Sequence, residues 1–272
     1  MKHVPTGIAG LDKMLNGGLP AGRCILLCGG PGSGKTILSW QFLYYGAVLY
    51  NEPGIYVSLD EDVNQLKEEI ASFGCSVEVS NNKRKTEGLG WNIEKLEKLK
   101  KIAVVDASPI RLLPGKIKIG NIRIGKRDFS LASLMDIVEK KVKGINAKRV
   151  VIDPITALTL QYHDNVERRT AVLDLFEALT RLGTTNLITT ELRRVGLERE
   201  ISTEEFLAHG VIILHTFTNN REIVRGIQIE KMRGIAHDTQ IRPYAITHNG
   251  IEVFPQEEPL VDADFATSRV HI

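Results

Sequence analysis

The chain has 272 residues, of which 43% are hydrophobic and 25% are charged, and these fractions are ordinary for a globular protein that can bury a substantial core. No stretch approaches ~20 continuous apolar residues, which argues against a membrane-spanning helix, and residues 1–5 lack the apolar core of a signal peptide. The three cysteines are an odd number without metal-like spacing, which predicts core positions for Cys24 and Cys28 and a reducing cytoplasm for the protein.

Strand and helix signals alternate through the first two thirds of the chain. Short apolar runs predict strands at residues 24–28, 54–59, 102–106, 149–153 and 186–190. Segments with helical spacing follow at residues 37–43, 62–73, 131–142 and 168–182, and Gly74 and Gly183 act as stop signals. Alternation of this kind predicts an α/β fold with a mainly parallel central sheet that is flanked by helices.

The pattern changes after residue 210, where strands follow one another through short turns. The predicted strands span residues 211–216, 222–231, 244–247 and 251–254. Such a run is typical of antiparallel pairing, so we expect antiparallel strands at the C-terminal side of the sheet. We expect one domain over residues 1–259 and a loose tail over residues 260–272.

Residues 29–36 match the phosphate-loop pattern G-x-x-x-x-G-K-[ST] at every fixed position. The loop lies between a predicted strand and a predicted helix, which is the context that the motif requires. Its backbone N–H groups would close around phosphate groups, and the helix N-terminus adds positive potential. We expect Lys35 to reach the β- and γ-phosphates and Thr36 to place its hydroxyl on Mg²⁺. The alternative is a glycine-rich turn that binds nothing.

Carboxylates follow two of the predicted strands. Asp153 ends its strand on the ligand edge of the sheet, where it would hold Mg²⁺ directly or through water; the alternative is a helix cap before Pro154. Asp60 and Glu61 follow another strand on the same edge, and one of them would orient and deprotonate the attacking water. Their mutual repulsion predicts a perturbed pKa for at least one. Capping of the following helix is an equal alternative.

Three basic side chains gather near the end of a later strand, at Lys231, Arg233 and His237. Lys231 and Arg233 share a side of that strand, and Gly234 interrupts it. They are either a surface feature or the cations that complete a nucleotide site in the same subunit or in a neighbouring one.

Basic residues are concentrated in residues 83–149, which contain 18 Lys and Arg against 7 Asp and Glu. Within a basic insertion at residues 83–127, strict alternation around Gly120-Asn121 predicts a two-residue β-hairpin at residues 116–124. The predicted register pairs Ile117 with Ile124, Lys118 with Arg123, and Ile119 with Ile122. The basic segment is either a solvated edge or a contact for an anionic partner such as nucleic acid, although aromatic stacking residues are missing from the hairpin.

At this point the residues resemble a known family. The chain resembles a single-domain member of the KaiC-like branch of the RecA superfamily of ATPases. The resemblance covers about residues 4–255 and rests on motifs that follow in family order: residues 5–12, 17–20, 29–36, 60–61, 72–74, 106–109, 152–153, 189–191, 204–206 and 231–234. It implies a RecA-type fold, ATP or ADP with Mg²⁺ as cofactors, and a homo-oligomeric ring, expected to be a hexamer, with nucleotide between the subunits.

The resemblance also implies roles for individual residues. The nucleotide-binding set is Gly30, Pro31, Gly32, Ser33, Gly34, Lys35, Thr36, Ile37, Ser72, Phe73, Lys231, Met232, Arg233 and His237. Ser72 and Phe73 match positions near the adenine, and Lys231 and Arg233 would reach the γ-phosphate of the next subunit's ATP. The catalytic residues would be Glu61, Asp60 and Lys35, and the metal ligands Thr36 and Asp153. Asp60 stands where family members usually have Glu, which favours Glu61 as the water-activating residue.

These features predict a slow, Mg²⁺-dependent ATPase whose ring acts as a regulatory or signalling switch and could bind a protein partner. Glu205 and Phe206 stand where one domain of the clock members carries an autophosphorylated Ser-Thr pair, which argues against an autophosphorylation cycle at these positions. Two alternatives stay open. One is a DNA-acting motor or recombinase, and the other is a nucleotide-sensing binding protein with negligible hydrolysis.

Overall fold

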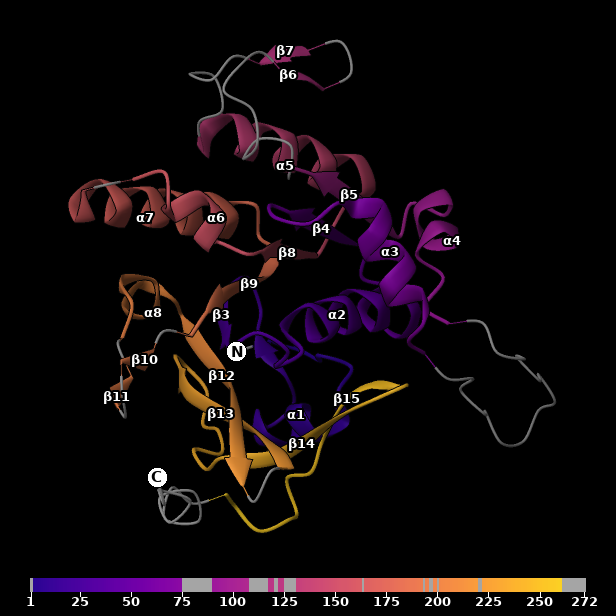
Figure 1. Cartoon of the computed structure of the whole chain (residues 1–272). Coiled ribbons are helices and arrows are strands. Elements are labelled where there is room, and N and C mark those ends of the chain that lie inside the picture. Colours follow the sequence, from indigo (N-terminus) through magenta and orange to yellow (C-terminus); the bar gives the residue numbers. More distant parts are fainter. Residues whose placement is uncertain are drawn as a thin grey trace, which may run out of the picture.

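The protein is described from a computed structural model, which describes residues 2–74, 90–107, 117–119, 122–124, 131–162, 164–192, 194–195, 198–199, 201–219 and 222–260. A central sheet is built from β3 (Cys24–Gly29), β4 (Gly54–Ser58), β5 (Ile102–Asp106), β8 (Arg149–Asp153), β9 (Thr185–Glu191), β12 (Gly210–Asn219), β13 (Glu222–Met232), β14 (Arg242–Thr247) and β15 (Gly250–Val253). These nine strands lie in the order β15-β14-β13-β12-β3-β9-β8-β4-β5 (Figure 1).

The sheet has a parallel part and an antiparallel part. From β5 through β4, β8, β9 and β3 to β12, every neighbouring pair is parallel. From β12 through β13 and β14 to β15, the pairing is antiparallel, as the sequence predicts. The sequence did not predict that β12 also pairs in parallel with β3 and therefore belongs to both parts.

Helices cover both faces of the sheet. On one face lie α1 (Ala9–Met14), α2 (Lys35–Leu49), α3 (Val63–Ala71) and α4 (Ile93–Lys98), and on the other lie α5 (Leu131–Ile145), α6 (Thr156–Thr159), α7 (Asn165–Arg181) and α8 (Thr203–Leu207). The predicted helix at 37–43 is the middle of α2, which begins at Lys35. The helices predicted at 131–142 and 168–182 correspond to α5 and α7, whereas α1, α4, α6 and α8 were not predicted.

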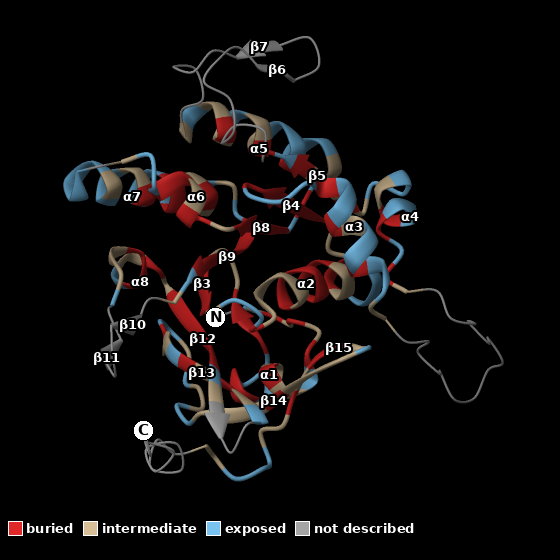
Figure 2. Ribbon diagram, viewed as in Figure 1, coloured by how far each residue is buried: buried red, intermediate tan, exposed pale blue. Residues whose placement is uncertain are grey.

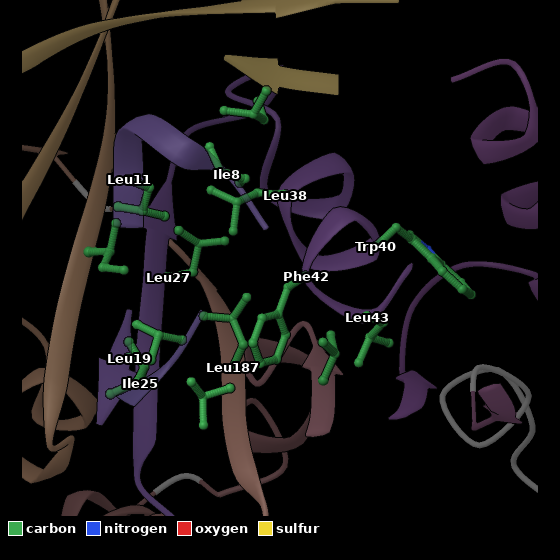
Figure 3. Packing of buried hydrophobic residues seen from close by; sticks show 14 of the residues in the cluster. Ile8, Leu11, Leu19, Ile25, Leu27, Leu38, Trp40, Phe42, Leu43 and Leu187 are labelled. Atoms are coloured by element: carbon green, nitrogen blue, oxygen red, sulfur yellow. The ribbon is translucent and has the colours of Figure 1, made fainter. Parts of the chain in front are cut away.

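Alternation along the parallel strands divides the core into two layers. In β8, Val150 and Ile152 pack under α5 and α7, whereas Val151 packs on the α2 side, as the period-2 geometry of a strand requires. Figure 2 shows the central strands buried and the outer faces of α3, α4 and α7 exposed. Figure 3 shows the α2 layer, in which Leu27 and Leu187 of the sheet face Leu38 and Phe42 of α2. Cys24 and Cys28 are buried in the other layer, in agreement with their predicted core position.

Three short strand pairs lie outside the central sheet. They are β1 (His3–Val4) with β2 (Leu19–Pro20), β6 (Ile117–Ile119) with β7 (Ile122–Ile124), and β10 (Arg194–Val195) with β11 (Glu198–Arg199). The register of β6 and β7 confirms the predicted hairpin, with Lys118 opposite Arg123. None of the helices in the described ranges is long and apolar enough to cross a membrane.

The described chain stops after Gly74 and resumes at Gly90, and the two ends lie side by side. The N–H of Trp91 donates to the carbonyl oxygen of Phe73 at 2.6 Å, and the N–H of Gly74 donates to that of His248 at 2.8 Å. Gly74 has φ +102 and lies against the Trp91 ring, a conformation and a close approach that favour glycine. Cys75 lies outside the described residues.

Candidate nucleotide-binding site

A cavity of about 370 Å³ lies at the C-terminal edge of the parallel strands, beside the phosphate loop. This edge is where open α/β sheets bind their ligands. The residues that line the cavity are Pro31, Gly32, Gly34, Lys35, Thr36, Ile37, Tyr56, Ser58, Asp60, Glu61, Asp153, Pro154, Glu191 and Ile246. The structure therefore brings the phosphate loop and all three predicted carboxylates to one cavity.

The phosphate loop is shaped by glycine conformations and held by hydrogen bonds. Gly32 and Gly34 have φ +71 and +89, values that side chains other than glycine rarely adopt. The Ser33 hydroxyl donates to the Gly30 carbonyl at 2.8 Å, and the Tyr244 hydroxyl donates to the Ser33 carbonyl at 2.6 Å. Because Gly34 is the residue before α2, the loop leads directly into the positive end of that helix.

Lys35 extends along the loop at the start of α2. Its Nζ donates to the carbonyl oxygens of Gly29 at 2.8 Å and of Gly30 at 3.0 Å. Burial lowers the pKa of Lys35, while the charges of Asp153 and Glu191 act in the opposite direction. Its ammonium group is thus placed among loop carbonyls at the position where an anionic ligand would meet it.

Asp153 accepts hydrogen bonds from three uncharged hydroxyl groups. Thr36 donates to Oδ2 at 3.0 Å and Tyr56 donates to the same oxygen at 2.5 Å, while Thr189 donates to Oδ1. The carboxyl group is not a helix cap, since α6 begins after Ile155 without a side-chain cap. The alternative interpretation of Asp153 is therefore wrong.

The oxygen atoms of Asp153 and Thr36 suit a magnesium ion as ligands. Mg²⁺ prefers oxygen ligands and is usually bound through one or two carboxylates together with phosphate oxygens and water. Thr36 and Asp153 supply a hydroxyl and a carboxylate in direct contact, at the cavity where phosphates would lie. The described residues contain no group of three or more His, Cys, Asp or Glu side chains that could hold a metal alone.

Glu61 lines the same cavity and is half-buried. The Ser58 hydroxyl donates to the Glu61 carbonyl oxygen at 2.7 Å, which fixes the backbone where β4 ends. Burial, and then the negative charges of Asp153 and Glu69, raise the pKa of Glu61. The pKa of Glu61 is thus perturbed, but by burial first and by Asp153 and Glu69 next, and not by the repulsion from Asp60 that the sequence suggested. Helix α3 is capped by Asp62, whose Oδ1 accepts from two backbone N–H groups, instead of by Asp60 or Glu61.

The predicted basic residues do not line this cavity within the chain. Lys231 Nζ donates to the carbonyl oxygens of Glu205 at 2.9 Å and Phe206 at 3.2 Å, and Arg233 donates to that of Phe206 at 3.4 Å. Met232 is buried in β13, opposite Gly210. The ring nitrogen Nδ1 of His237 lies 3.4 Å from the Ile235 carbonyl oxygen.

Two further predicted residues lie at the end of α3 instead of at the cavity. The Ser72 hydroxyl donates to the Glu69 carbonyl at 2.6 Å, and the Phe73 ring lies 5.9 Å from the Trp91 ring, centroid to centroid. Sequence reasoning missed five lining residues: Tyr56, Ser58, Pro154, Glu191 and Ile246. In the strand predicted at residues 54–59, Tyr56 and Ser58 alternate with apolar residues. This two-residue period is the signal that would have placed both side chains on one face of the sheet.

Comparisons with known proteins identify the family of the chain. A family model described as "ATPase: KaiC" matches residues 4–86 and 77–258. The circadian clock oscillator protein KaiC of Thermostichus vulcanus is 33% identical over 256 residues, which cover 94% of this chain and 44% of that protein. A UPF0273 protein of Methanocaldococcus jannaschii is 35% identical over 259 residues, which cover 94% of this chain and 98% of that protein.

A solved structure is similar over nearly its whole length. The crystal structure of a KaiC-like protein from Pyrococcus horikoshii matches with a TM-score of 0.74 and 36% sequence identity, covering 93% of this chain and 99% of that one. The chain thus spans 44% of the length of the clock protein of T. vulcanus. It spans almost all of the two archaeal proteins.

Proposed function

The chain belongs to the KaiC ATPase family, and from this premise we propose that it is a slow, Mg²⁺-dependent ATPase whose homo-oligomeric ring acts as a regulatory switch. Membership and the RecA-type fold make it a nucleotide-binding P-loop protein. One observation carries the proposal of hydrolysis. The Thr36 hydroxyl and the Asp153 carboxylate are in contact beside Lys35, in a cavity that Glu61 also lines.

We assign the binding of the triphosphate to the loop and the start of α2. The backbone N–H groups of residues 30–36 and the Lys35 ammonium would neutralise the phosphate oxygens. Thr36 and Asp153 would hold Mg²⁺, which supplies charge stabilisation at the phosphates when it is bound. Tyr56 and Thr189 keep the Asp153 carboxylate oriented, because both donate to it from neighbouring strands.

Glu61 is the residue we propose as the general base. A base works best when its pKa lies near the working pH, and the raised pKa of Glu61 moves it in that direction. Its carboxylate would orient the attacking water and accept a proton from it. Asp60 lines the same cavity and would assist by its charge.

Apart from Lys35, no lysine or arginine among the described residues lines the cavity, so the transferred phosphoryl group would need a further cation on its opposite side. Lys231 and Arg233 would supply it from the next subunit, in the manner of an arginine finger, because neither lines the cavity of its own chain. We propose a hexameric ring in which ATP contacts both subunits at each interface, so that hydrolysis weakens the ring. Residues 1–259 would form this one ATPase domain, which would act in the cytoplasm.

The test combines light scattering with ATP turnover. We expect an ATP analogue to shift the protein to a larger oligomer, and Glu61→Gln to keep that oligomer while turnover falls about 10²-fold or more. Arg233→Ala should lower turnover about 10³-fold while each subunit still binds nucleotide. Arg181→Ala, at an exposed arginine of α7, is the matched control and should behave as the native chain. Normal turnover of Arg233→Ala in a stable oligomer would overturn the shared site.

Two other functions are outcomes of related measurements. Stimulation of turnover by single-stranded DNA, with a salt-dependent shift of the DNA, would indicate a DNA-acting motor instead. Loss of partner binding in Lys35→Ala, with partner binding intact in Glu61→Gln and no turnover in the native chain, would indicate a nucleotide sensor.

A further inference from the structure

We propose that an ion pair between the half-buried Arg168 and the buried Glu204 positions α8, and that the end of α8 holds Lys231 and Arg233 in place for the neighbouring subunit's nucleotide. This inference rests on the proposed function, since it concerns the cations that complete the shared site. It assigns a positioning role to two residues that do not line the cavity.

The first step is the contact between the two cations and the end of α8. Lys231 Nζ lies 2.9 Å from the Glu205 carbonyl oxygen, and both Lys231 and Arg233 reach the carbonyl oxygen of Phe206. Carbonyl groups in the last turn of a helix have unused acceptor capacity and partial negative charge. Because the carbonyl groups carry no net charge, they orient Lys231 and Arg233 without cancelling the positive charge that a γ-phosphate would meet.

The second step is the short length of α8. A helix of five residues, Thr203–Leu207, is too short to be stable by itself, so other contacts must fix the position of its carbonyl groups. At its start, the Glu205 carboxylate accepts from the Ser202 N–H at 3.0 Å. That local contact closes the first turn but does not tie α8 to the rest of the fold.

The third step is the ion pair that ties α8 to α7, in addition to the packing of Leu207 on the core. Arg168 in α7 donates to Glu204 Oε1 through Nε at 2.9 Å and through its terminal nitrogen at 2.5 Å. Glu204 is 1% exposed, and its other oxygen, Oε2, is buried without a hydrogen-bond partner in the described part of the chain. Since α7 packs on the core through Leu175 and Phe176, the pair fixes α8 to a rigid element.

Removal of the charge of Glu204 should therefore act at a distance from the nucleotide. Glu204→Gln should lower kcat about 10- to 100-fold, the range expected when reacting groups are misplaced by about 1 Å. The Kd for a fluorescent ATP analogue on the isolated subunit should stay unchanged, because the cavity is separate. Arg169→Gln removes the same amount of charge from an exposed position of α7 and should leave both values unchanged.

A mixing experiment separates misplaced cations from general damage. Glu61→Gln subunits have intact cations but no base, whereas Glu204→Gln subunits have an intact base but displaced cations. In a head-to-tail ring formed from equal amounts, about a quarter of the sites combine the intact halves of both, so the mixture should be more active than either variant alone. Arg168→Lys, which keeps the charge but loses the two-pronged contact, should show a smaller loss and the same rescue.

The outcomes distinguish this inference from the function on which it rests. Each variant is mixed with Glu61→Gln subunits. If mixing rescues Arg233→Ala but rescues neither Glu204→Gln nor Arg168→Lys, the shared site stands and the positioning role is wrong. If Arg233→Ala is not rescued either, the shared site itself is wrong. Unchanged kcat in both Glu204→Gln and Arg168→Lys would also overturn the positioning role.

Discussion

The two ends of β8 carry buried charges that are compensated in different ways. At the first residue, Arg149 is fully buried, and it donates twice to Glu52 Oε2, at 2.9 and 2.7 Å, and once to the Phe42 carbonyl at 2.8 Å. Its guanidinium group also lies 4.5 Å from the centre of the Phe42 ring. At the last residue, Asp153 is 8% exposed and accepts from the uncharged hydroxyls of Thr36, Tyr56 and Thr189.

The difference separates a charge that stabilises the fold from a charge that is available to a ligand, at the two ends of one strand. The Glu52 carboxylate cancels the charge of Arg149, so that no charge is left for a ligand. Gly46 leaves the space that the guanidinium group fills. Hydroxyl groups around Asp153 orient the carboxylate but leave its negative charge for a cation. Four experiments would break or sharpen this comparison.

The largest effect is expected at Arg149. Arg149→Leu should lower the free energy of unfolding by about 3–5 kcal/mol, because the change breaks a buried ion pair and leaves Glu52 without its partner. Denaturant unfolding measures the loss, and the surviving folded protein should still bind the ATP analogue. Lys148→Leu, at the exposed neighbouring position, is the control and should change the stability little. A stable Arg149→Leu protein would show that the pair does not maintain the fold.

At the other end of the strand, activity should be lost without loss of stability. Asp153→Asn keeps the size of the side chain but removes the charge that would hold Mg²⁺, so turnover should fall about 10²- to 10³-fold. The free energy of unfolding should not decrease by more than about 1 kcal/mol, since an uncharged amide is easier to bury. Turnover over a magnesium titration, with parallel unfolding curves, provides the check. Full activity would remove Asp153 from the metal site.

Glu61, which lines the cavity at the Asp153 end of β8, should make both turnover and stability depend on pH. As a base it acts when ionised, so its raised pKa should place the acid limb of the kcat/KM profile above the ordinary value of 4.5. The folded state binds this proton more tightly than the unfolded state, so the group's contribution to stability should fall as the pH rises from 4.5 through the raised pKa. Glu61→Gln should remove that fall, as unfolding curves across pH would show. An identical pH dependence in both proteins would contradict this assignment.

The smallest effect is expected for a single hydroxyl. Tyr56→Phe removes one of the three hydroxyl groups that donate to Asp153. The lost hydrogen bond is worth about 1 kcal/mol, so magnesium-dependent turnover should fall about fivefold. The Tyr56 ring should stay in place, because it stacks on Trp40 at 4.3 Å between centroids. Tyr44→Phe is the matched control, since Tyr44 stacks on Trp91 and does not line the cavity. Equal effects of the two changes would show that the hydroxyl has no role at Asp153.

The sequence predicts the elements whose signals are local. The strands at 102–106 and 149–153 have the same bounds in the structure, because apolar β-branched runs ended by polar residues are strong signals. The helices α4, α6 and α8 are shorter than the window in which helical spacing can be recognised. The parallel pairing of β12 with β3 depends on the position of a strand in the finished sheet, which no local pattern encodes.

For the candidate site, the loop motif and the ends of strands predicted Lys35, Thr36, Glu61 and Asp153 as neighbours. Tyr56 was not predicted because an aromatic residue inside a strand looks like part of the core, and its hydroxyl matters only through its contact with Asp153. The link from Arg168 to Glu204 joins residues that lie 36 positions apart, and only the folded structure shows it.

The contact between Phe73 and Trp91 has a consequence for protein engineering and for divergence between relatives. Because these residues are hydrogen-bonded to each other, the chain leaves the core and returns to it at almost one point. For a flexible chain that joins two such points, the entropic cost of closure rises by about 0.6 kcal/mol for each doubling of its length. A reporter domain whose own termini lie close together should therefore be accommodated between Gly74 and Gly90 without displacing Phe73 or Trp91.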